Sequence, residues 1–224
     1  MITFYYGSGS APAWRVWLAL EHKQLPYEFK LMSFSAGDLK SPVYRALNPR
    51  GQVPLIVDDG FALWESSAIV EYLEEQYAAT PRLFPGSTRE RSVVRRWVSE
   101  IDDNFGAALA KLTGWVLWTP KDQWKEERIA EARQGVLDEL DTIAARMGGN
   151  DGGGDGGVGE FLARNTLTAA DFALYPLLAT LARCDLKKPD LKMVVSRPAK
   201  IAAWAKRIEA LPYFAKTVPP HWKE

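Results

Sequence analysis

Residues 48–54 read NPRGQVP, and a second stretch at residues 64–69 reads WESSAI. The first stretch puts Pro54 directly before an apolar run, Leu55–Asp58, that is expected to form a strand. Proline has no N–H for a strand ladder, so it belongs at strand starts and sheet edges. One reason for a proline here is a cis bond to Val53, which turns the chain sharply. The backbone N–H and C=O of Val53 would then point outward, where an extended peptide can bind them as a neighbouring strand does.

The second stretch places a carboxylate where a strand gives way to a helix. Residues 61–64 are apolar and residues 67–76 have helical spacing, so Glu65 and Ser66 lie at the junction. Backbone N–H groups at the start of a helix attract a carboxylate, and Glu65 beside them can hold an ammonium group. The two stretches together predict a socket for a small zwitterionic peptide.

The composition is that of a globular protein with a substantial core. The chain has 224 residues, 47% of them hydrophobic and 25% charged, which suits one large domain or two small ones. Lys and Arg number 28 and so do Asp and Glu, so no net field favours nucleic acid or a membrane surface. The single cysteine, Cys184, excludes internal disulfides and fits a reducing compartment. With no signal-peptide pattern and no apolar run of spanning length, we expect a cytoplasmic protein without nucleic-acid or membrane partners.

The first half of the chain alternates strands and helices. Period-two and helical patterns predict strands at residues 2–6, 27–32, 55–57 and 61–64, and helices at 12–22, 41–47 and 67–77. Asp58, Asp59 and Gly60 form a turn signal between the last two strands. The order β-α-β-α-β-β-α predicts a small α/β layer, not a full Rossmann domain.

The second half is helical. Residues 79–87 contain two prolines and a glycine without periodicity, and we interpret them as the linker between a domain at 1–78 and a helical domain at 88–224. Helices are expected at 88–117, 121–147, 168–183 and 199–211. Thr168 and Asp171 have the spacing of a capping box at the start of the third. The glycine-rich residues 148–159 lack the ending of a phosphate loop and are interpreted as a flexible linker.

This organisation resembles the glutathione transferase superfamily. The resemblance is carried by residues 39–42, 48–54 and 65–73 in the first half, most like the phi, beta, tau and zeta classes, and by residues 167–171 in the second. Several motifs in the right order and spacing, over nearly the whole chain, make it specific. It implies an α/β thioredoxin-like N-terminal domain plus an all-α C-terminal helical domain, usually in a homodimer.

The resemblance also implies how glutathione is bound. Val53, beside Pro54, would bind the cysteinyl part through its backbone. Glu65 and Ser66 would bind the γ-glutamyl end. Lys40, with Gln52, would bind the glycine end. Glutathione is then a co-substrate, and neither a metal nor a resident cofactor is expected.

The reaction implied is attack of the glutathione thiolate on a hydrophobic electrophile. A thiol has a pKa of about 8.5, so the protein must stabilise the thiolate at neutral pH. Ser10, which opens the first helix five positions before Arg15, is the candidate hydroxyl. A hydrogen bond to a charged group contributes about 1.5–3 kcal/mol and a helix N-terminus about 0.3–1 kcal/mol. Together they cover a shift of about 1.5 to 3 pKa units, so no general base is required in a chain whose two histidines are His22 and His221.

Other residues remain alternatives for the catalytic hydroxyl. Ser8 lies in the same turn, and Tyr5 and Tyr6 end the first strand. The isomerase branch of the zeta class carries a Ser-Ser-Cys run where this chain has Ser, Ala and Pro at residues 10–12. That departure argues against maleylacetoacetate isomerase activity and against disulfide exchange through an enzyme thiol.

The second substrate is left open by the sequence. Most of the nine tryptophans are expected to pack in the core or at an interface, and Trp115, Trp118 and Trp222 are candidates for lining a cleft for an apolar co-substrate. Two other functions stay open: a non-catalytic glutathione-binding or scaffold protein, and a glutathione-dependent peroxidase.

Overall fold

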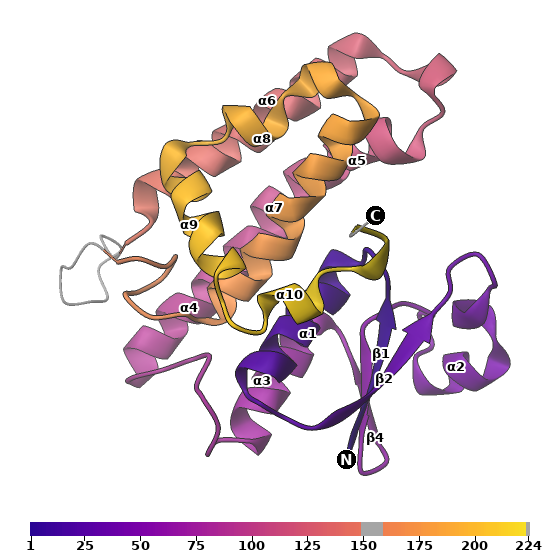
Figure 1. Ribbon diagram of the computed structural model, residues 1–224, viewed down its shortest axis with the longest axis vertical. Helices are drawn as coiled ribbons and strands as arrows, with labels where there is room; N and C mark the ends of the chain where they lie inside the picture. Colours follow the sequence, from indigo (N-terminus) through magenta and orange to yellow (C-terminus); the bar gives the residue numbers. More distant parts are fainter. Residues whose placement is uncertain (149–158, 223–224) are drawn as a thin grey trace. The chain divides into compact units, whose positions relative to one another are not determined.

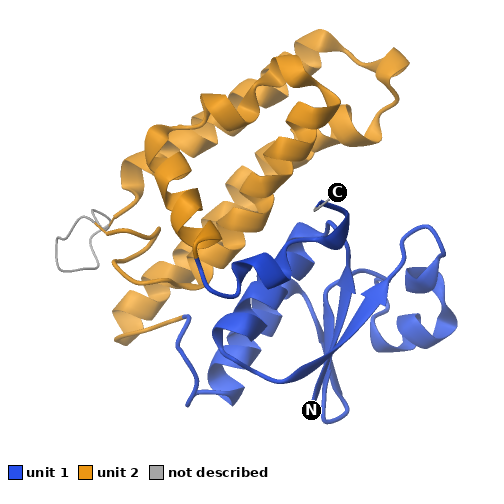
Figure 2. Cartoon of the chain, in the orientation of Figure 1, with its two compact units in different colours: residues 1–83, 211–224 blue, residues 84–210 orange. Residues whose placement is uncertain are grey.

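The computed structural model describes residues 1–148 and 159–222, which form two compact units (Figure 2). Unit 1 is Met1–Leu83 together with the C-terminal segment that begins at Leu211, and unit 2 is Phe84–Ala210. The domain bounds expected at residues 78 and 88 stay a prediction. Unit 1 contains the C-terminal segment together with the α/β half. The glycine-rich linker expected at 148–159 lies outside the described residues except for its two ends.

Unit 1 is a mixed sheet covered by helices (Figure 1). Its strands are β1 Ile2–Gly7, β2 Tyr27–Met32, β3 Leu55–Asp58 and β4 Phe61–Trp64, and its helices are α1 Ala11–His22, α2 Pro42–Leu47, α3 Ser66–Gln76 and α10 Phe214–Thr217. The strand order is β2-β1-β3-β4, with β1 parallel to β2 and antiparallel to β3, and β3 antiparallel to β4. The thioredoxin-like arrangement expected of the first half is confirmed.

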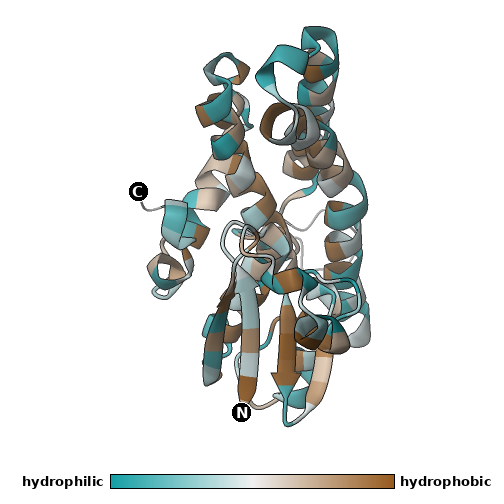
Figure 3. Ribbon diagram, turned by 90° about the vertical axis from the view of Figure 1, so that its right-hand side faces the viewer, coloured by the Kyte–Doolittle hydropathy of each residue, from teal (hydrophilic) through white to brown (hydrophobic). Residues whose placement is uncertain are grey.

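Strand β1 divides its side chains between two helical layers. Tyr6 is fully buried and its ring centroid lies 5.0 Å from that of Trp17 in α1. The ring of Tyr5 instead lies 5.7 Å from that of Tyr44 in α2. Because successive side chains of a strand point to opposite faces, α1 covers one face of the sheet and α2 the other. Figure 3 shows hydrophobic colour along strands of the sheet that lies between these layers.

The C-terminal segment is fastened to α1. The indole N–H of Trp14, a buried residue of α1, donates to Oγ1 of buried Thr217 at 2.9 Å. The ring of Trp14 also packs on Phe214 and Trp222, with centroids 6.0 and 5.3 Å away. A buried indole N–H is usually paired, so this bond needs the C-terminal segment in place.

A buried ion pair joins α1 to α3. Lys23, just after α1, is 0% exposed and donates to Oε2 of Glu74, itself 1% exposed, at 3.0 Å. The Glu74 carboxylate also accepts from the backbone N–H of Leu83 at 2.9 Å and from the Arg82 guanidinium. Buried charges are tolerated when they are paired and hydrogen-bonded. Here the pair joins Arg82 and Leu83, which follow α3, to the packed helices α1 and α3.

Unit 2 is helical. It contains α4 Thr88–Glu100, α5 Gly106–Thr113, α6 Glu126–Arg146, α7 Ala169–Lys187, α8 Met193–Ser196 and α9 Ala199–Glu209, with π-helical turns at Ile101–Phe105 and Gly114–Trp118. The single helix expected at 88–117 is thus continued through two π-helical turns, which a 3.6-residue pattern does not distinguish from regular helix. The helix expected from 121 begins at Glu126, because Lys121–Gln123 form a short 3₁₀ turn. No helix in the described part of the chain is long and apolar enough to span a membrane.

The capping box expected at Thr168 and Asp171 is confirmed and does more than cap α7. The Asp171 carboxylate accepts from the backbone N–H groups of Thr168 and Leu162 at 2.8 and 3.0 Å, and from the indole N–H of Trp204 in α9 at 2.8 Å. Asp171 is 0% exposed. One buried carboxylate therefore holds the start of α7, the loop before it and α9 together.

The turn from β4 to α3 places Glu65 in an unfavourable backbone conformation. Glu65 has φ 70° and ψ 110°, and it directly precedes α3. A residue with a Cβ held in such a sparsely populated region costs about 1–3 kcal/mol, and such positions cluster at functional sites. The strain is therefore a reason to look for function at this turn.

The Asp171→Asn variant is expected to unfold more easily. An amide oxygen replaces only one carboxylate oxygen, and the NH₂ group would face buried donors; each unsatisfied buried donor costs about 1–3 kcal/mol. We expect the free energy of unfolding, measured in urea, to fall by about 2–3 kcal/mol. Exposed Asp138→Asn in α6 is the control and should stay within about 0.5 kcal/mol. Equal effects of both changes would contradict the prediction.

The Glu65→Gly variant is expected to be more stable than the natural protein. Glycine removes the Cβ that makes a positive φ costly, a relief of about 1–3 kcal/mol, and loses roughly 0.5–1 kcal/mol through backbone entropy. The net gain in unfolding free energy should be about 1 kcal/mol. Glu65→Ala keeps the Cβ and should show no such gain, so equal stability of the two variants would refute the strain at Glu65.

Candidate functional site

Ser10 caps α1 at the edge of the sheet in unit 1. Its Oγ accepts from the backbone N–H of Ala13 at 3.3 Å, and its own N–H donates to the carbonyl of Gly7 at 3.0 Å. The first turn of α1 contains no acidic residue. The positive end of the helix is thus not neutralised from within its own first turn. Because the Ser10 hydroxyl accepts at this cap, its proton can be donated to another acceptor.

The tyrosines of β1 are occupied by packing. Tyr6 is 0% exposed and its hydroxyl accepts from the backbone N–H of Gly9 at 3.4 Å. Burial raises the pKa of Tyr6 to about 12. Tyr5 faces Tyr44 on the other side of the sheet. A ligand at the turn after β1 therefore meets serines before it meets a tyrosine hydroxyl.

Two glycines allow other segments to approach the turn after β1. A Cβ on Gly7 would lie 2.9 Å from Cγ2 of Val53 and 2.5 Å from the ring of Phe34. A Cβ on Gly9, where φ is 86°, would lie 2.9 Å from Cε1 of His221. The structure thus brings Val53 against Gly7, the residue whose carbonyl accepts from the backbone N–H of Ser10.

The loop before β3 is fixed in front of Val53. The Gln52 carbonyl accepts from the Tyr44 hydroxyl at 2.7 Å and from Nδ2 of Asn48 at 2.8 Å, and Asn48 is only 1% exposed. The peptide bond between Val53 and Pro54 is cis, as expected. Across residues 1–148 and 159–222, no hydrogen bond is found for the backbone N–H or C=O of Val53. These groups are available to a ligand's backbone.

Glu65 and Ser66 lie at the N-terminus of α3, as expected from the strand-to-helix junction. The Glu65 carboxylate is exposed, and one oxygen lies 3.8 Å from Nε of Arg50. Nearby, Nη1 of Arg15 in α1 donates to Oγ of Ser67 at 2.8 Å. This bond links the second turn of α1 to the first turn of α3, close to the two helix ends on which the expected site depends.

Lys40 ends a 3₁₀ turn, Asp38–Lys40, and is exposed. The carbonyl of Leu39 approaches Gly51 so closely that a Cβ there would lie 2.6 Å from it. The segments carrying Lys40 and Gln52 are therefore in contact, which agrees with one ligand end meeting both. The assignment of these residues to glutathione stays a prediction, and the described residues contain no cluster of three or more His, Cys, Asp or Glu suited to a metal.

His221 is the residue at this turn that the sequence does not reveal. Its Nδ1 lies 2.5 Å from Oγ of Ser8, although the two residues are 213 positions apart. It belongs to the short 3₁₀ turn Pro220–Trp222 in the C-terminal segment. No local pattern announces such a contact, because it depends on the C-terminal segment returning to α1.

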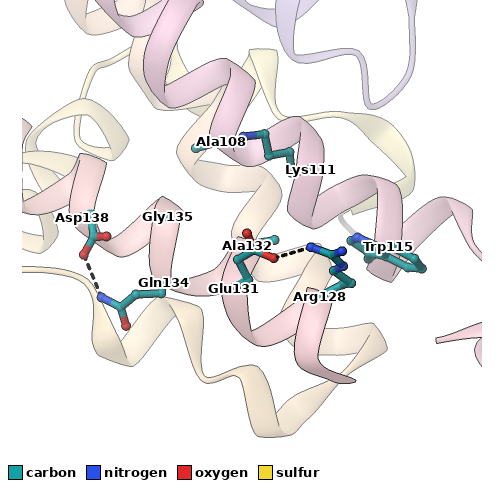
Figure 4. A pocket seen from close by; sticks show the side chains of 9 residues that line it. All are labelled: Ala108, Lys111, Trp115, Arg128, Glu131, Ala132, Gln134, Gly135 and Asp138. Carbon is teal, nitrogen blue, oxygen red and sulfur yellow. Dashed lines mark hydrogen bonds and ion pairs between the residues drawn. The ribbon is translucent and has the colours of Figure 1, made fainter. Parts of the chain in front are cut away.

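A separate cavity of about 830 Å³ lies within unit 2 (Figure 4). Lys111 and Trp115 line it from one side, and Arg128, Glu131 and Asp138 of α6 from the other. Arg128 donates to Glu131 at 2.9 Å, so two of the charged side chains on its wall form an ion pair. Trp115 is thus at a cavity, whereas Trp118 is 79% exposed and Trp222 lies in unit 1. The tryptophan-lined cleft for a co-substrate stays a prediction.

Family models match both halves of the chain. The model described as "Glutathione S-transferase, N-terminal domain" matches residues 9–76, and the model described as "Glutathione S-transferase, C-terminal domain" matches residues 126–207. The first match contains Ser10, Val53 and Glu65, and the second contains Asp171.

Full-length relatives agree with these matches. The chain is 31% identical to the "Probable maleylacetoacetate isomerase" of Vibrio cholerae, over 98% of this chain and 95% of the relative. It is 28% identical to "Glutathione S-transferase A" of Pleuronectes platessa, over 100% of this chain and 93% of the relative.

Solved structures share the fold. A glutathione S-transferase from the Antarctic clam Laternula elliptica matches with a TM-score of 0.80 and 31% identity, over 100% of this chain and 94% of that one. Glutathione transferase F2 of Populus trichocarpa matches with a TM-score of 0.81 at 24% identity over the full length of both chains, which shows the fold. With two domain models, relatives above 30% identity and the same fold along its length, this chain belongs to the glutathione S-transferase superfamily of enzymes.

Proposed function

We propose that this protein transfers glutathione to a hydrophobic electrophile and that Ser10 stabilises the glutathione thiolate. The observation that carries the proposal is the Ser10 hydroxyl at the N-terminus of α1, in the turn that Val53 contacts at Gly7, with no acidic residue in the helix's first turn. A thiolate there receives both an O–H donor and the positive end of the helix.

Three groups of residues would hold glutathione in the orientation that presents its sulfur to Ser10. The backbone of Val53, beside Pro54, would pair with the cysteinyl part as a strand does. Glu65 and Ser66 would take the γ-glutamyl end, with the helix N-terminus binding its carboxylate. Lys40 and Gln52, from touching segments, would take the glycine carboxylate.

The chemistry needs only a stabilised nucleophile. With an aryl or alkyl halide, the sulfur forms a bond to carbon while the carbon–halogen bond breaks and the halide leaves with its electron pair. Activated alkenes and organic peroxides are the other electrophiles within reach of the same thiolate. We propose glutathione as co-substrate without a resident metal or cofactor, and a cytoplasmic homodimer with a role in detoxification.

Ser10→Ala is expected to slow conjugation of glutathione to a model aryl halide while leaving glutathione binding nearly unchanged. A hydrogen bond to a charged group contributes about 1.5–3 kcal/mol, so turnover at neutral pH should fall about 10- to 100-fold. Calorimetry measures the binding and absorbance the turnover. Loss of the cap costs about 1 kcal/mol of stability, so Ser10→Thr, which keeps both cap and hydroxyl, is the matched control.

Two outcomes would change the assignment. A larger loss of turnover in Ser8→Ala than in Ser10→Ala would transfer the role to Ser8. Unchanged turnover in both variants would remove the serine hydroxyls from the reaction. Glutathione binding without turnover of any halide, alkene or peroxide would favour the non-catalytic binding protein, and turnover of peroxides alone would favour the peroxidase.

The likeness to a relative named as a probable maleylacetoacetate isomerase makes isomerisation the second candidate. Against it stand Ala11 and Pro12, which follow Ser10 at the first turn of α1. Neither side chain supplies a hydroxyl or a thiol to a substrate bound there.

We therefore expect no glutathione-dependent isomerisation of maleylacetoacetate by the natural protein, under conditions in which a model halide is turned over. The conversion is followed by absorbance, with glutathione alone as the background. Isomerisation well above that background would refute this prediction and make the isomerase the first candidate.

A further inference from the structure

The Ser8–His221 pair places an imidazole at the same turn as Ser10. The 2.5 Å separation of Ser8 Oγ and His221 Nδ1 is a short hydrogen bond. The imidazole ring also lies over Gly9, where only the absence of a Cβ makes room for it. His221 therefore sits beside the residue that separates the two candidate serines.

The position of His221 is held by several contacts besides its bond to Ser8. Its neighbour Trp222 packs edge-on against Trp14 of α1, and Thr217 accepts from the same indole. Farther along α1, Nδ1 of His22 lies 2.9 Å from the hydroxyl of Tyr213. The C-terminal segment is thus anchored along α1, and a contact made by its last turn is part of the fold of unit 1.

We propose that His221 is the base that takes up the proton of the glutathione thiol, through the hydroxyl of Ser8. The inference rests on the proposed function and deepens it. When Nδ1 carries no proton, the Ser8 hydroxyl donates to it. Histidine is the side chain whose ordinary pKa suits proton uptake near neutral pH.

The proton transfer balances without another reactant. The S–H bond of glutathione breaks as its proton passes to Ser8 Oγ, and the Ser8 hydroxyl proton passes to Nδ1 of His221. A thiol and a neutral imidazole become a thiolate, donated to by Ser10, and an imidazolium. After the sulfur has bonded to the electrophile, the imidazolium returns its proton through Ser8 to solvent or to the departing group.

Titratable groups from β1, α1 and α10 lie on the elements around the C-terminal segment. The Tyr6 hydroxyl, from β1, contacts Ser8, and burial raises its pKa to about 12, so it stays neutral in the working range. On α1, Arg15 donates to Ser67 and Glu21 pairs with Lys216 of α10 at 2.6 Å. His22, at the end of α1, lies against Tyr213, and burial lowers the pKa of its imidazole.

A catalytic base and a purely structural residue at position 221 would respond differently to substitution. If His221 had only a structural role, any side chain that keeps the hydrogen bond to Ser8 could substitute for it. Loss of that bond would then lower turnover equally at every pH. If His221 is the base, an amide side chain cannot substitute for it. Loss of the imidazole would then raise the pH at which the bound glutathione thiol ionises. His221→Asn separates the two, because its amide can bond Ser8 and does not titrate.

The test measures the thiolate of bound glutathione by its ultraviolet absorbance as pH is raised, together with the pH profile of turnover. In His221→Asn and in Ser8→Ala, the midpoint of thiol ionisation should rise by about one pH unit, which lowers turnover about tenfold below neutral pH and leaves it nearly unchanged in alkali. His22→Asn, which changes the other histidine but keeps a polar group able to bond the Tyr213 hydroxyl, is the control and should keep the natural midpoint.

An unchanged midpoint in His221→Asn, with glutathione still bound and turned over, would overturn the proposal. An equal loss of turnover at all pH values in His221→Asn would also overturn it, because that result is expected of a purely structural residue. Failure of the natural protein to bind glutathione would instead overturn the proposed function itself. Circular dichroism and unfolding in urea show whether each variant is folded, and His221→Gln repeats the test if His221→Asn is not.

Discussion

The site depends on a turn that carries almost no side-chain volume. At Gly7 and Gly9 the space that a Cβ would fill is taken by Phe34, Val53 and His221. Three segments distant in the sequence therefore meet at the turn that leads into the N-terminus of α1, where we expect the glutathione sulfur to bind. Any side chain at either glycine would push one of these segments away, so the chemistry of the site is limited first by packing.

Local patterns in the sequence were sufficient for most of unit 1. The strand-initial Pro54 and the carboxylate of Glu65 are recognised from residues within ten positions, because turns and helix starts are decided locally. The same holds for Thr168 and Asp171 in unit 2. Ser8 and His221 could not be paired in this way, since their contact follows from where a distant segment packs. The π-helical turns were missed because one extra residue per turn hardly alters an apolar pattern.

Unit 1 combines a strained turn with a buried ion pair that joins two of its helices. Glu65 is held in a strained conformation at the expected site, whereas Lys23 and Glu74, away from the turn after β1, form a fully hydrogen-bonded buried pair. The first feature lowers stability at the turn where we expect the γ-glutamyl end of glutathione to bind. The second would be costly if either partner were missing, so it fixes how α1 and α3 pack. A rigid helical layer lets a strained turn persist at its edge.

The discontinuous make-up of unit 1 has a consequence for biosynthesis. Its C-terminal segment leaves the ribosome only after all of unit 2 has been made, because Phe84–Ala210 lies between the two parts. During that interval Trp14 lacks the hydroxyl that its indole N–H donates to, and the turn after β1 lacks its imidazole. The nascent α/β layer is consequently incomplete until residues 211–222 have followed unit 2 out of the ribosome.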